Sequence, residues 1–381
     1  MKKILSVIVV VVVTLTQTEQ ITAFAQETDK PAVNAQACVL YCVDDGKVYF
    51  SVNENKKMKP ASTTKLMTSL ITLEYADSAD KVVAFTKDMT AEGSSMYLKV
   101  GEKVKLSDLA AGMMMASGND AANAAAISIA GSAEKFSELM NNRAAVIGMK
   151  NTHFVTPSGL DDENHYSTAY DMALLMSYAL ENESFAKLTS QKSVTVEFSE
   201  PQSKRTTYTN HNRLLSMYEY CTGGKTGYTM AAGRCLVSSA KKDGLTFVCV
   251  TLNDRNDWND HIALYNYGFS KLACVECDDS DYYLEIPCAG GDDESISVTG
   301  TKGKNVVVPF DKKSNVVRTA YADNFLYAPV KDGDIVGRIE YTLDGKTLAS
   351  TNLTAVEYSN TQNKNKSIWT KIKDFFTYGK E

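Results

Sequence analysis

The hydrophobic pattern of the chain changes character near residue 278. Between about residues 36 and 275, short apolar runs alternate with long stretches rich in Ala, Met and Leu, which is typical of strands interspersed with helices. The long stretches predict helices at 63–75 and 110–130, and the second is apolar almost all round, which predicts burial. The short runs predict strands at 38–43, 47–52, 235–239 and 246–252.

After residue 278 the pattern becomes one of short alternating segments, separated by Gly-Gly-Asp, Lys-Gly-Lys and Asp-Gly turns. Alternation of this kind between turn residues predicts strands of ordinary length. They would form a small all-β module, which contains no obvious catalytic cluster. The predicted strands are 282–287, 295–298, 305–309, 315–321, 335–341 and 347–356.

The end of the chain is amphipathic. Residues 357–366 are polar and rich in Asn and Lys. On a following helix, one stripe would hold Ile368, Trp369, Ile372, Phe375 and Phe376, with Lys364, Lys366, Lys371, Lys373 and Lys380 flanking it. Aromatic residues beside lysines favour a helix lying in a membrane surface, so we predict a linker and a membrane-anchoring helix over 357–381. The alternatives are a terminal helix docked on its own β module and a frayed tail.

The start of the chain has the layout of an export signal. Lys2 and Lys3 precede an apolar run over 4–15, and Ala23-Phe24-Ala25 is a small-x-small cleavage pattern. An uncleaved membrane helix is the alternative, but about 20 apolar residues are needed to cross a bilayer and this run is shorter. We therefore predict a signal peptide over 1–25, a mature chain from Gln26, and export.

Composition sets the scale of the folded part. The chain has 381 residues, of which 44% are hydrophobic, so we expect two folded units, a catalytic one over 26–275 and the β module over 276–356. The net charge is −6 and the folded part has no long basic run, which excludes nucleic acid as an expected partner.

The cysteines and histidines predict no metal site or cofactor. Eight cysteines are few for this length, and their number leaves any pairing open. Cys274 and Cys277 form a C-x-x-C pair, but no second pair stands at ligand spacing. The four histidines form no H-E-x-x-H arrangement of a metallopeptidase.

The motif Ser62-Thr-Thr-Lys65 carries the first candidate chemistry. A serine hydroxyl is a poor nucleophile until a neighbouring base takes its proton, and a spacing of three on a helix places the two side chains on one face. Lysine can act as that base only where burial or a nearby cation lowers its pKa, and Lys225 is a candidate for the cation. The motif alone is weak, because surface helices contain it often.

Two further motifs follow in order. Ser117-Gly118-Asn119 precedes an alanine-rich helix and offers a hydroxyl as proton relay and an amide for the substrate backbone. Lys225-Thr226-Gly227 precedes a strand-like run, and small residues on an edge strand allow a peptide to pair alongside. Each could be a simple cap or turn by itself. Together the three motifs predict a serine acyl-transfer site without a histidine.

These motifs resemble those of the low-molecular-mass penicillin-binding proteins, the serine-type D-alanyl-D-alanine carboxypeptidases. Longer blocks at 60–68, 116–121, 151–160, 166–172 and 225–229 extend the resemblance. It implies an α/β (α+β) catalytic domain of the penicillin-binding and serine β-lactamase type, an antiparallel sheet with helices, followed by a small all-β domain and a terminal amphipathic helix. It also implies two ligands, a peptidoglycan stem peptide ending in D-Ala-D-Ala and β-lactam antibiotics.

The resemblance also implies roles for individual residues. Ser62 attacks the penultimate D-alanine carbonyl with Lys65 as base, and Ser117 passes a proton toward the leaving amine. Backbone N–H groups of Ser62 and Tyr228 form the oxyanion hole. The remaining residues that it assigns to substrate binding are Asn119, Lys225, Thr226, Gly227 and Thr229.

Two questions stay open at this level. The cation that clamps the terminal carboxylate has four candidates, which are His211, Arg213, Arg234 and Arg255. The class of protein has two alternatives. A β-lactamase needs a carboxylate to activate the deacylating water, for which Glu138 with Asn142 is a superficial candidate, although both follow the second motif too closely. A non-catalytic peptidoglycan-binding protein would be expected to lack Ser62 or Lys65, and both are present.

Overall fold

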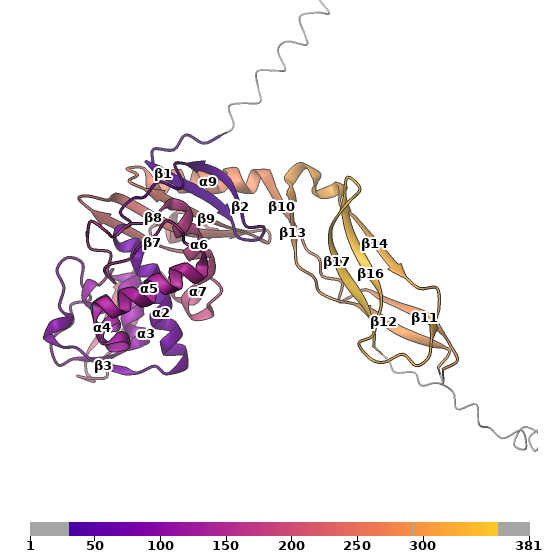
Figure 1. The fold of residues 1–381 in the computed structure, drawn as a ribbon, viewed down its shortest axis with the longest axis horizontal. Coiled ribbons are helices and arrows are strands. Elements are labelled where there is room, and N and C mark those ends of the chain that lie inside the picture. The colour runs from indigo at the N-terminus through magenta and orange to yellow at the C-terminus, as the bar shows by residue number, and fades with distance from the viewer. Residues whose placement is uncertain (1–29, 292, 357–381) are drawn as a thin grey trace, which may run out of the picture. The chain divides into compact units, whose positions relative to one another are not determined.

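The structure is a computed structural model that describes residues 30–291 and 293–356 (Figure 1). The chain divides into two compact units between Lys271 and Leu272, and each is described by itself below. The predicted signal peptide and the predicted terminal helix lie outside the described residues. Within 30–291 and 293–356, no helix has both the length and the apolar character needed to cross a membrane.

The first unit is built around one antiparallel sheet of five strands in the order β2-β1-β9-β8-β7 (Figure 1). The predicted strands all lie in it. Because β1 pairs with β9, the two ends of the unit meet in the middle of the sheet, and β7 is left as an edge strand. The bounds are β1 Ala37–Cys42, β2 Lys47–Val52, β7 Cys221–Thr229, β8 Gly233–Lys242 and β9 Leu245–Leu252.

Both faces of the central strands are covered. Alternate residues of β1 and β9, such as Val39 and Val250, belong to the main core together with Ala173 of α6. Residues on the opposite face, Leu40 and Phe247, contact Gly268 of α9. Burial on both faces explains why β9 is an almost continuous apolar run. The helices are α2 Lys65–Ser78, α3 Leu106–Met115, α4 Asn119–Ala130, α5 Ala133–Ile147, α6 Ala169–Ala179, α7 Glu183–Thr189, α8 Leu214–Met217 and α9 Asp257–Lys271.

Three further short elements belong to this unit. Two are hairpins outside the main sheet, of which one joins β3 to β4 and the other joins β5 to β6. The third is a 3-10 turn, η2. Their bounds are β3 Val82–Ala84, β4 Lys103–Lys105, β5 Ser193–Glu197, β6 Arg205–Thr209 and η2 Lys87–Met89.

The predicted helix over 110–130 is wrong as one element, because two helices, α3 and α4, meet there. Ser117 has φ +56°, a left-handed conformation that ends α3, and the Gly118 N–H then donates to the Gly112 carbonyl. Burial is as predicted, with Met113 to Met115 in the core. The break places Ser117, which is buried, at the entrance to α4.

The second unit is all-β, as predicted (Figure 1). A sheet of six strands has the order β14-β16-β17-β12-β11-β15, and β10 pairs with β13 beside it. All six predicted strands are present, while β10 and the two-residue β15 were missed. The bounds are β10 Leu272–Val275, β11 Tyr283–Ala289, β12 Ser295–Gly300, β13 Val306–Pro309, η3 Phe310–Asn315, β14 Val317–Ala322, β15 Leu326–Tyr327, β16 Ile335–Leu343 and β17 Lys346–Ala355.

Candidate active site

The nucleophile candidate lies in a tight turn. Ser62 is part of a 3-10 turn, η1 Ala61–Thr64, and Lys65 is the first residue of α2. The prediction placed Ser62 at the start of an α-helix, whereas the turn is tighter because Thr63 donates to the Pro60 carbonyl through both its N–H and its hydroxyl. The three-residue spacing still brings the Lys65 Nζ to 2.9 Å from the Ser62 Oγ.

Lys65 has three oxygen partners around its amine. Its side chain is fully buried, and its Nζ lies 2.7 Å from both the Asn119 Oδ1 and the Ser158 carbonyl oxygen. Burial, and then the positive charge of Lys225, lower the pKa of Lys65 well below its usual value. A neutral amine has two N–H bonds for these two acceptors and one lone pair, which then faces the Ser62 hydroxyl. The arrangement can therefore take the proton of Ser62.

Lys225 and Ser117 form a second pair. The Lys225 Nζ donates to the Ser117 Oγ over 3.1 Å and to the Thr226 carbonyl over 2.8 Å. Burial lowers the pKa of Lys225 to about 7. Because Ser117 comes from the break between α3 and α4 and Lys225 from the edge strand β7, this contact joins the helices to the sheet across the site.

Asn119 has both ends of its amide engaged. Its Oδ1 accepts from Lys65, and its Nδ2 donates to the Glu92 carbonyl over 2.7 Å. Its backbone N–H donates to the Ser94 carbonyl. The implied substrate contact of Asn119 would require the bond to Glu92 to open. In this structure Asn119 orients Lys65 and holds residues 92–94 beside the nucleophile.

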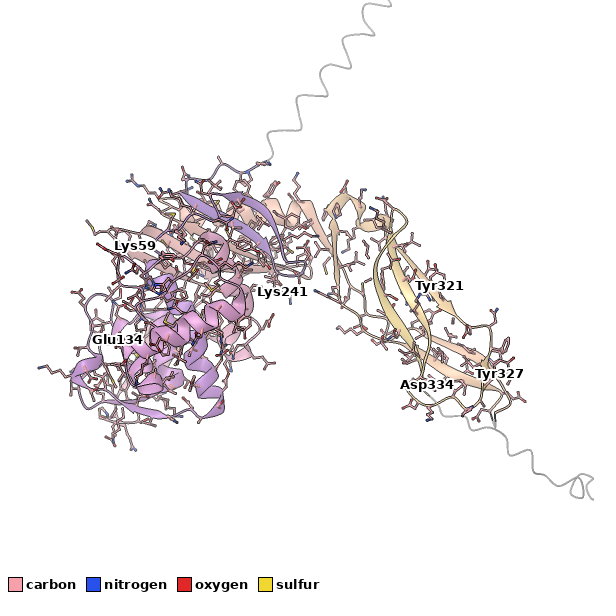
Figure 2. The ribbon with its side chains drawn as sticks, in the orientation of Figure 1. Lys59, Glu134, Lys241, Tyr321, Tyr327 and Asp334 are labelled. Atoms are coloured by element: carbon pink, nitrogen blue, oxygen red, sulfur yellow. The ribbon has the colours of Figure 1, made fainter. Side chains whose placement is uncertain are left out.

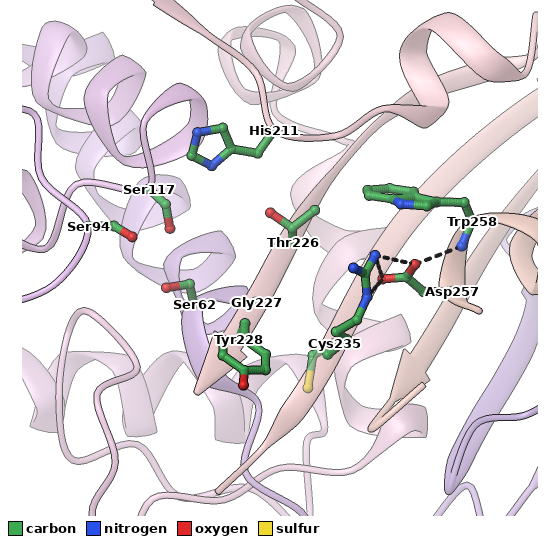
Figure 3. Close-up of a pocket in the computed structure, with 11 residues that line it drawn as sticks. Ser62, Ser94, Ser117, His211, Thr226, Gly227, Tyr228, Cys235, Asp257 and Trp258 are labelled. Atoms are coloured by element: carbon green, nitrogen blue, oxygen red, sulfur yellow. Dashed lines mark hydrogen bonds and ion pairs between the residues drawn. The ribbon is translucent and has the colours of Figure 1, made fainter. Parts of the chain in front are cut away.

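The two pairs open onto a cleft of about 520 Å³ (Figure 3). Figure 3 shows the His211 ring beside Ser117 at one end, and Asp257 with Trp258 at the other. The motifs predicted only some of this lining. The cleft is lined by Ser62, Ser94, Ser117, His211, Thr226, Gly227, Tyr228, Arg234, Cys235, Asp257 and Trp258.

Gly227 holds the edge strand close to the nucleophile turn. A Cβ at this position would lie 3.0 Å from the backbone nitrogens of Ser62 and Thr63, so a larger residue would push β7 away. Tyr228 follows with its side chain 62% exposed at the rim. Thr229 does not line the cleft as implied, because its hydroxyl donates to the Asp161 carboxylate over 3.0 Å.

The structure separates the four candidate cations. Arg213 and Arg255 are exposed and do not line the cleft, whereas Arg234 and His211 do. Arg234 is held in place by Asp257, to which its Nε donates over 3.1 Å and its Nη2 over 2.6 Å, and its guanidinium lies 5.8 Å from the Trp258 ring centre. Burial and the charge of Lys225 lower the pKa of His211, which favours its neutral form.

Sequence reasoning missed Ser94, Cys235, Asp257 and Trp258 in the lining. Cys235 lies opposite Gly227 in the β7–β8 pairing. The predicted strand 235–239 includes it, but the prediction gave it no place in the site. Burial raises the pKa of its thiol to about 12, which keeps it protonated. Asp257 and Trp258 begin α9, and no local pattern in the sequence connects them with residues 62–65.

Comparison with known proteins agrees with this geometry. The sequence model of the D-alanyl-D-alanine carboxypeptidase family, peptidase S11, matches residues 24–256, and that of the penicillin-binding protein 5 C-terminal domain matches 278–359. The chain belongs to the D-alanyl-D-alanine carboxypeptidase family. The family resemblance inferred from the motifs is therefore confirmed.

Relatives of this family cover almost the whole chain. The chain is 32% identical over 372 residues to the D-alanyl-D-alanine carboxypeptidase DacF of Bacillus subtilis, covering 94% of each protein. It is 34% identical over 362 residues to DacC of Escherichia coli, covering 88% of this chain and 87% of the relative.

Solved structures of the family share the fold. Penicillin-binding protein 5 of Haemophilus influenzae aligns with a TM-score of 0.65 at 29% identity, covering 87% of this chain and 99% of that one. The carboxypeptidase DacD of Francisella tularensis aligns with a TM-score of 0.61 at 28% identity, covering 90% and 98%. The expected penicillin-binding and β-lactamase-like fold with its β domain is confirmed.

Proposed function

We propose that this family member is a serine-type D-Ala-D-Ala carboxypeptidase, which removes the terminal D-alanine from peptidoglycan pentapeptide stems through an acyl-enzyme on Ser62. The observation that carries the proposal is the environment of Lys65. In the neutral amine, the two N–H bonds have acceptors in Asn119 and Ser158, and the lone pair faces the Ser62 hydroxyl at 2.9 Å.

Acylation then follows from the two lysine pairs. Lys65 takes the proton of Ser62 as the Oγ attacks the penultimate D-alanine carbonyl, and the N–H groups of Ser62 and Tyr228 stabilise the oxyanion. Ser117, which accepts from Lys225, gives its proton to the departing nitrogen and takes the proton held by Lys65, so that D-alanine leaves and Lys65 is neutral again. Water then attacks the ester as Lys65 takes one of its protons, and Lys65 passes this proton to the Ser62 Oγ as the acyl group is released.

The substrate lies along the edge strand β7 in this proposal. Thr226 lines the cleft, and Gly227 lets the edge strand lie close to the nucleophile turn, so that a peptide paired along the strand reaches Ser62. Arg234 is the cation for the terminal carboxylate, because Asp257 and Trp258 hold its guanidinium inside the same cleft. Lys225 adds positive potential behind Thr226.

We expect Arg234→Gln to lower kcat/KM for a peptide with a free terminal carboxylate by about 10- to 100-fold, as the loss of a charge-assisted hydrogen bond does. The same peptide with an amidated terminus should be cleaved equally by both proteins. Since the change leaves the buried Asp257 unpaired, the double variant with Asp257→Asn provides a neutral background. Arg213→Gln and Arg255→Gln are the controls. A larger loss in His211→Gln would assign the clamp to His211 instead.

β-Lactam antibiotics are the second ligand class in this proposal, and they acylate the same hydroxyl. Deacylation is slow because the described lining of the cleft has no free carboxylate to activate water. Among the described residues that line the cleft, Asp257 is the acidic one and is bound to Arg234. Glu138 and Asn142, the candidates for a β-lactamase, are exposed on α5 and outside the cleft.

The test combines two measurements on the whole protein. D-alanine release from a peptide ending in D-Ala-D-Ala is followed together with labelling by a fluorescent penicillin, and the adduct is located by mass spectrometry. Release of D-alanine with a stable adduct on Ser62, absent from Ser62→Ala, is the expected result. Rapid penicillin turnover would identify a β-lactamase, and a protein that is neither labelled nor active would be a binding protein.

We also propose that the protein is exported and lies at the outer face of the cytoplasmic membrane, in the cell wall space of a bacterium. The proposal is supported by the export-signal pattern of residues 1–25 and the amphipathic pattern of residues 367–381. Deleting 367–381 should move the protein from the membrane fraction to the soluble fraction without loss of D-alanine release. Unchanged fractionation would contradict the membrane anchor.

A further inference from the structure

One segment of the chain, residues 156–165, is bound along the back of the nucleophile turn. The Ser158 carbonyl accepts from Lys65 and the Pro157 carbonyl accepts from the Thr68 hydroxyl over 2.6 Å. His165 lies 2.9 Å from the Thr64 Oγ1 through its Nε2. We call this segment the strap. It contacts residues on both sides of Ser62 but, in the described part of the chain, adds nothing to the cleft lining.

The strap is held as one piece by His165. Its Nδ1 accepts from the Val155 and Thr156 N–H groups over 3.1 and 3.3 Å, so the proton is on Nε2 and is donated to Thr64. Burial lowers the pKa of His165 to about 4, which keeps this neutral form at ordinary pH. The base of the strap therefore has a defined position relative to η1.

Asp161, in the middle of the strap, contacts two residues that flank the oxyanion donors, Thr229 at the end of β7 and Lys59 just before η1. Its Oδ1 accepts from the Thr229 hydroxyl over 3.0 Å and lies 3.9 Å from the Lys59 Nζ. Thr229 follows Tyr228 on β7, and Lys59 precedes Ser62 by three residues (Figure 2 labels Lys59). The Thr229 hydroxyl also accepts from the Ala232 N–H, so the same residue fixes the β7–β8 turn.

The two oxyanion donors need such a connection. The Ser62 N–H belongs to η1 and the Tyr228 N–H to the end of an edge strand, which has no partner strand on its outer side in the described sheet. An oxyanion hole is effective only when both donors are fixed before the charge develops, and a misplacement of about 1 Å can cost about 100-fold in rate. The Asp161 carboxylate connects the two elements from outside the cleft.

We propose that Asp161 is a positioning residue for the oxyanion hole, which sets the separation of the Ser62 and Tyr228 N–H groups by bonding to Thr229 and attracting Lys59. This inference rests on the proposed function. It differs from the role that the family resemblance implies for Thr229. Here the Thr229 hydroxyl binds Asp161 and positions β7, and it does not contact the substrate.

The bond to Thr229 is the dominant contact. Both side chains of the Lys59–Asp161 pair are 34% exposed, and the separation of 3.9 Å is long for an ion pair, so solvent weakens it. Asn at position 161 keeps an acceptor for the Thr229 hydroxyl, whereas Ala does not. The two substitutions therefore separate the hydrogen bond from the charge.

The experiment measures the second-order rate of acylation by a penicillin and the kcat and KM for a D-Ala-D-Ala peptide. Asp161→Ala should lower the acylation rate and kcat by about 10-fold with KM changed less than about twofold, because oxyanion bonds strengthen in the transition state. Thr229→Val should give the same loss, and the double variant no further loss. Asp161→Asn should stay within about threefold of the original protein.

The control is Glu163→Gln, which removes one negative charge from the same strap at an exposed side chain and should leave all three constants unchanged. A higher KM with unchanged kcat in Asp161→Ala would overturn the proposal and assign Asp161 to substrate contact. Additive losses in the double variant would overturn it too. Failure of the proposed function appears separately, as an original protein that releases no D-alanine and forms no adduct.

Discussion

Replacing Lys65 with methionine should lower the rate of Ser62 acylation by about 1,000-fold, within the range that general-base catalysis contributes. Methionine has a similar length and can be buried, but it has no lone pair that accepts the proton of Ser62. Lys65→Arg should be equally inactive, because a guanidinium stays protonated at every pH at which the protein is folded. The measurement is the second-order rate constant for labelling by a fluorescent penicillin.

The pH dependence of acylation in the unsubstituted protein tests independently whether Lys65 is the base. Protonated Lys65 cannot accept a proton, so acylation should rise with pH as Lys65 loses its proton, at a pH well below the usual lysine range. Lys225 acts in its charged form, and its pKa is lowered to about 7, so a falling limb should follow as that charge is lost. The expected profile is bell-shaped and belongs to the coupled pair.

The control for this substitution is Lys103→Met, which removes an exposed lysine paired with Glu200 and should not alter acylation. Urea unfolding of each variant, monitored by circular dichroism, establishes whether a variant that is not acylated is folded. Acylation of Lys65→Met within about 10-fold of the original rate would mean that another group is the base.

The second large effect is expected at Gly159. A Cβ at this position would lie 2.0 Å from the Ala61 carbonyl oxygen, and the residue has φ +79°, which side-chain-bearing residues rarely adopt. Neither backbone segment can move away without disturbing the site, because Ser158 binds Lys65 and Ala61 begins the nucleophile turn. Gly159→Ala should therefore cost about 3 kcal/mol or more in unfolding free energy and lower acylation about 100-fold.

A matched glycine separates the clash from the backbone conformation. Gly131 has φ +86° at the end of α4, and a Cβ added there would have nothing within 4 Å. Gly131→Ala therefore carries the conformational cost alone, about 1 kcal/mol. Urea unfolding and penicillin labelling are measured on both variants. Equal behaviour of the two would show that contact between the strap and η1 has no role in the site.

Local patterns were sufficient where neighbours in sequence are also neighbours in space. Six of the eight strands of the β module were predicted, because they show a period of two between turns. Ser62 and Lys65 are three residues apart, so a single turn brings hydroxyl and amine together. The prediction failed at 110–130, because the stretch was treated as one apolar run although the polar residues 117–120 interrupt it, and the structure places the break there.

By itself, the sequence determined the class of chemistry, the order of the three motifs and the two-part architecture, because these depend on residue type and short spacing. The tertiary structure decided that two of the four candidate cations, Arg234 and His211, line the cleft, that Asn119 contacts Lys65, and that Thr229 contacts Asp161. The last two are contacts between residues more than 50 positions apart. Such contacts depend on how whole helices and strands pack together, and a local sequence pattern contains no information on that packing.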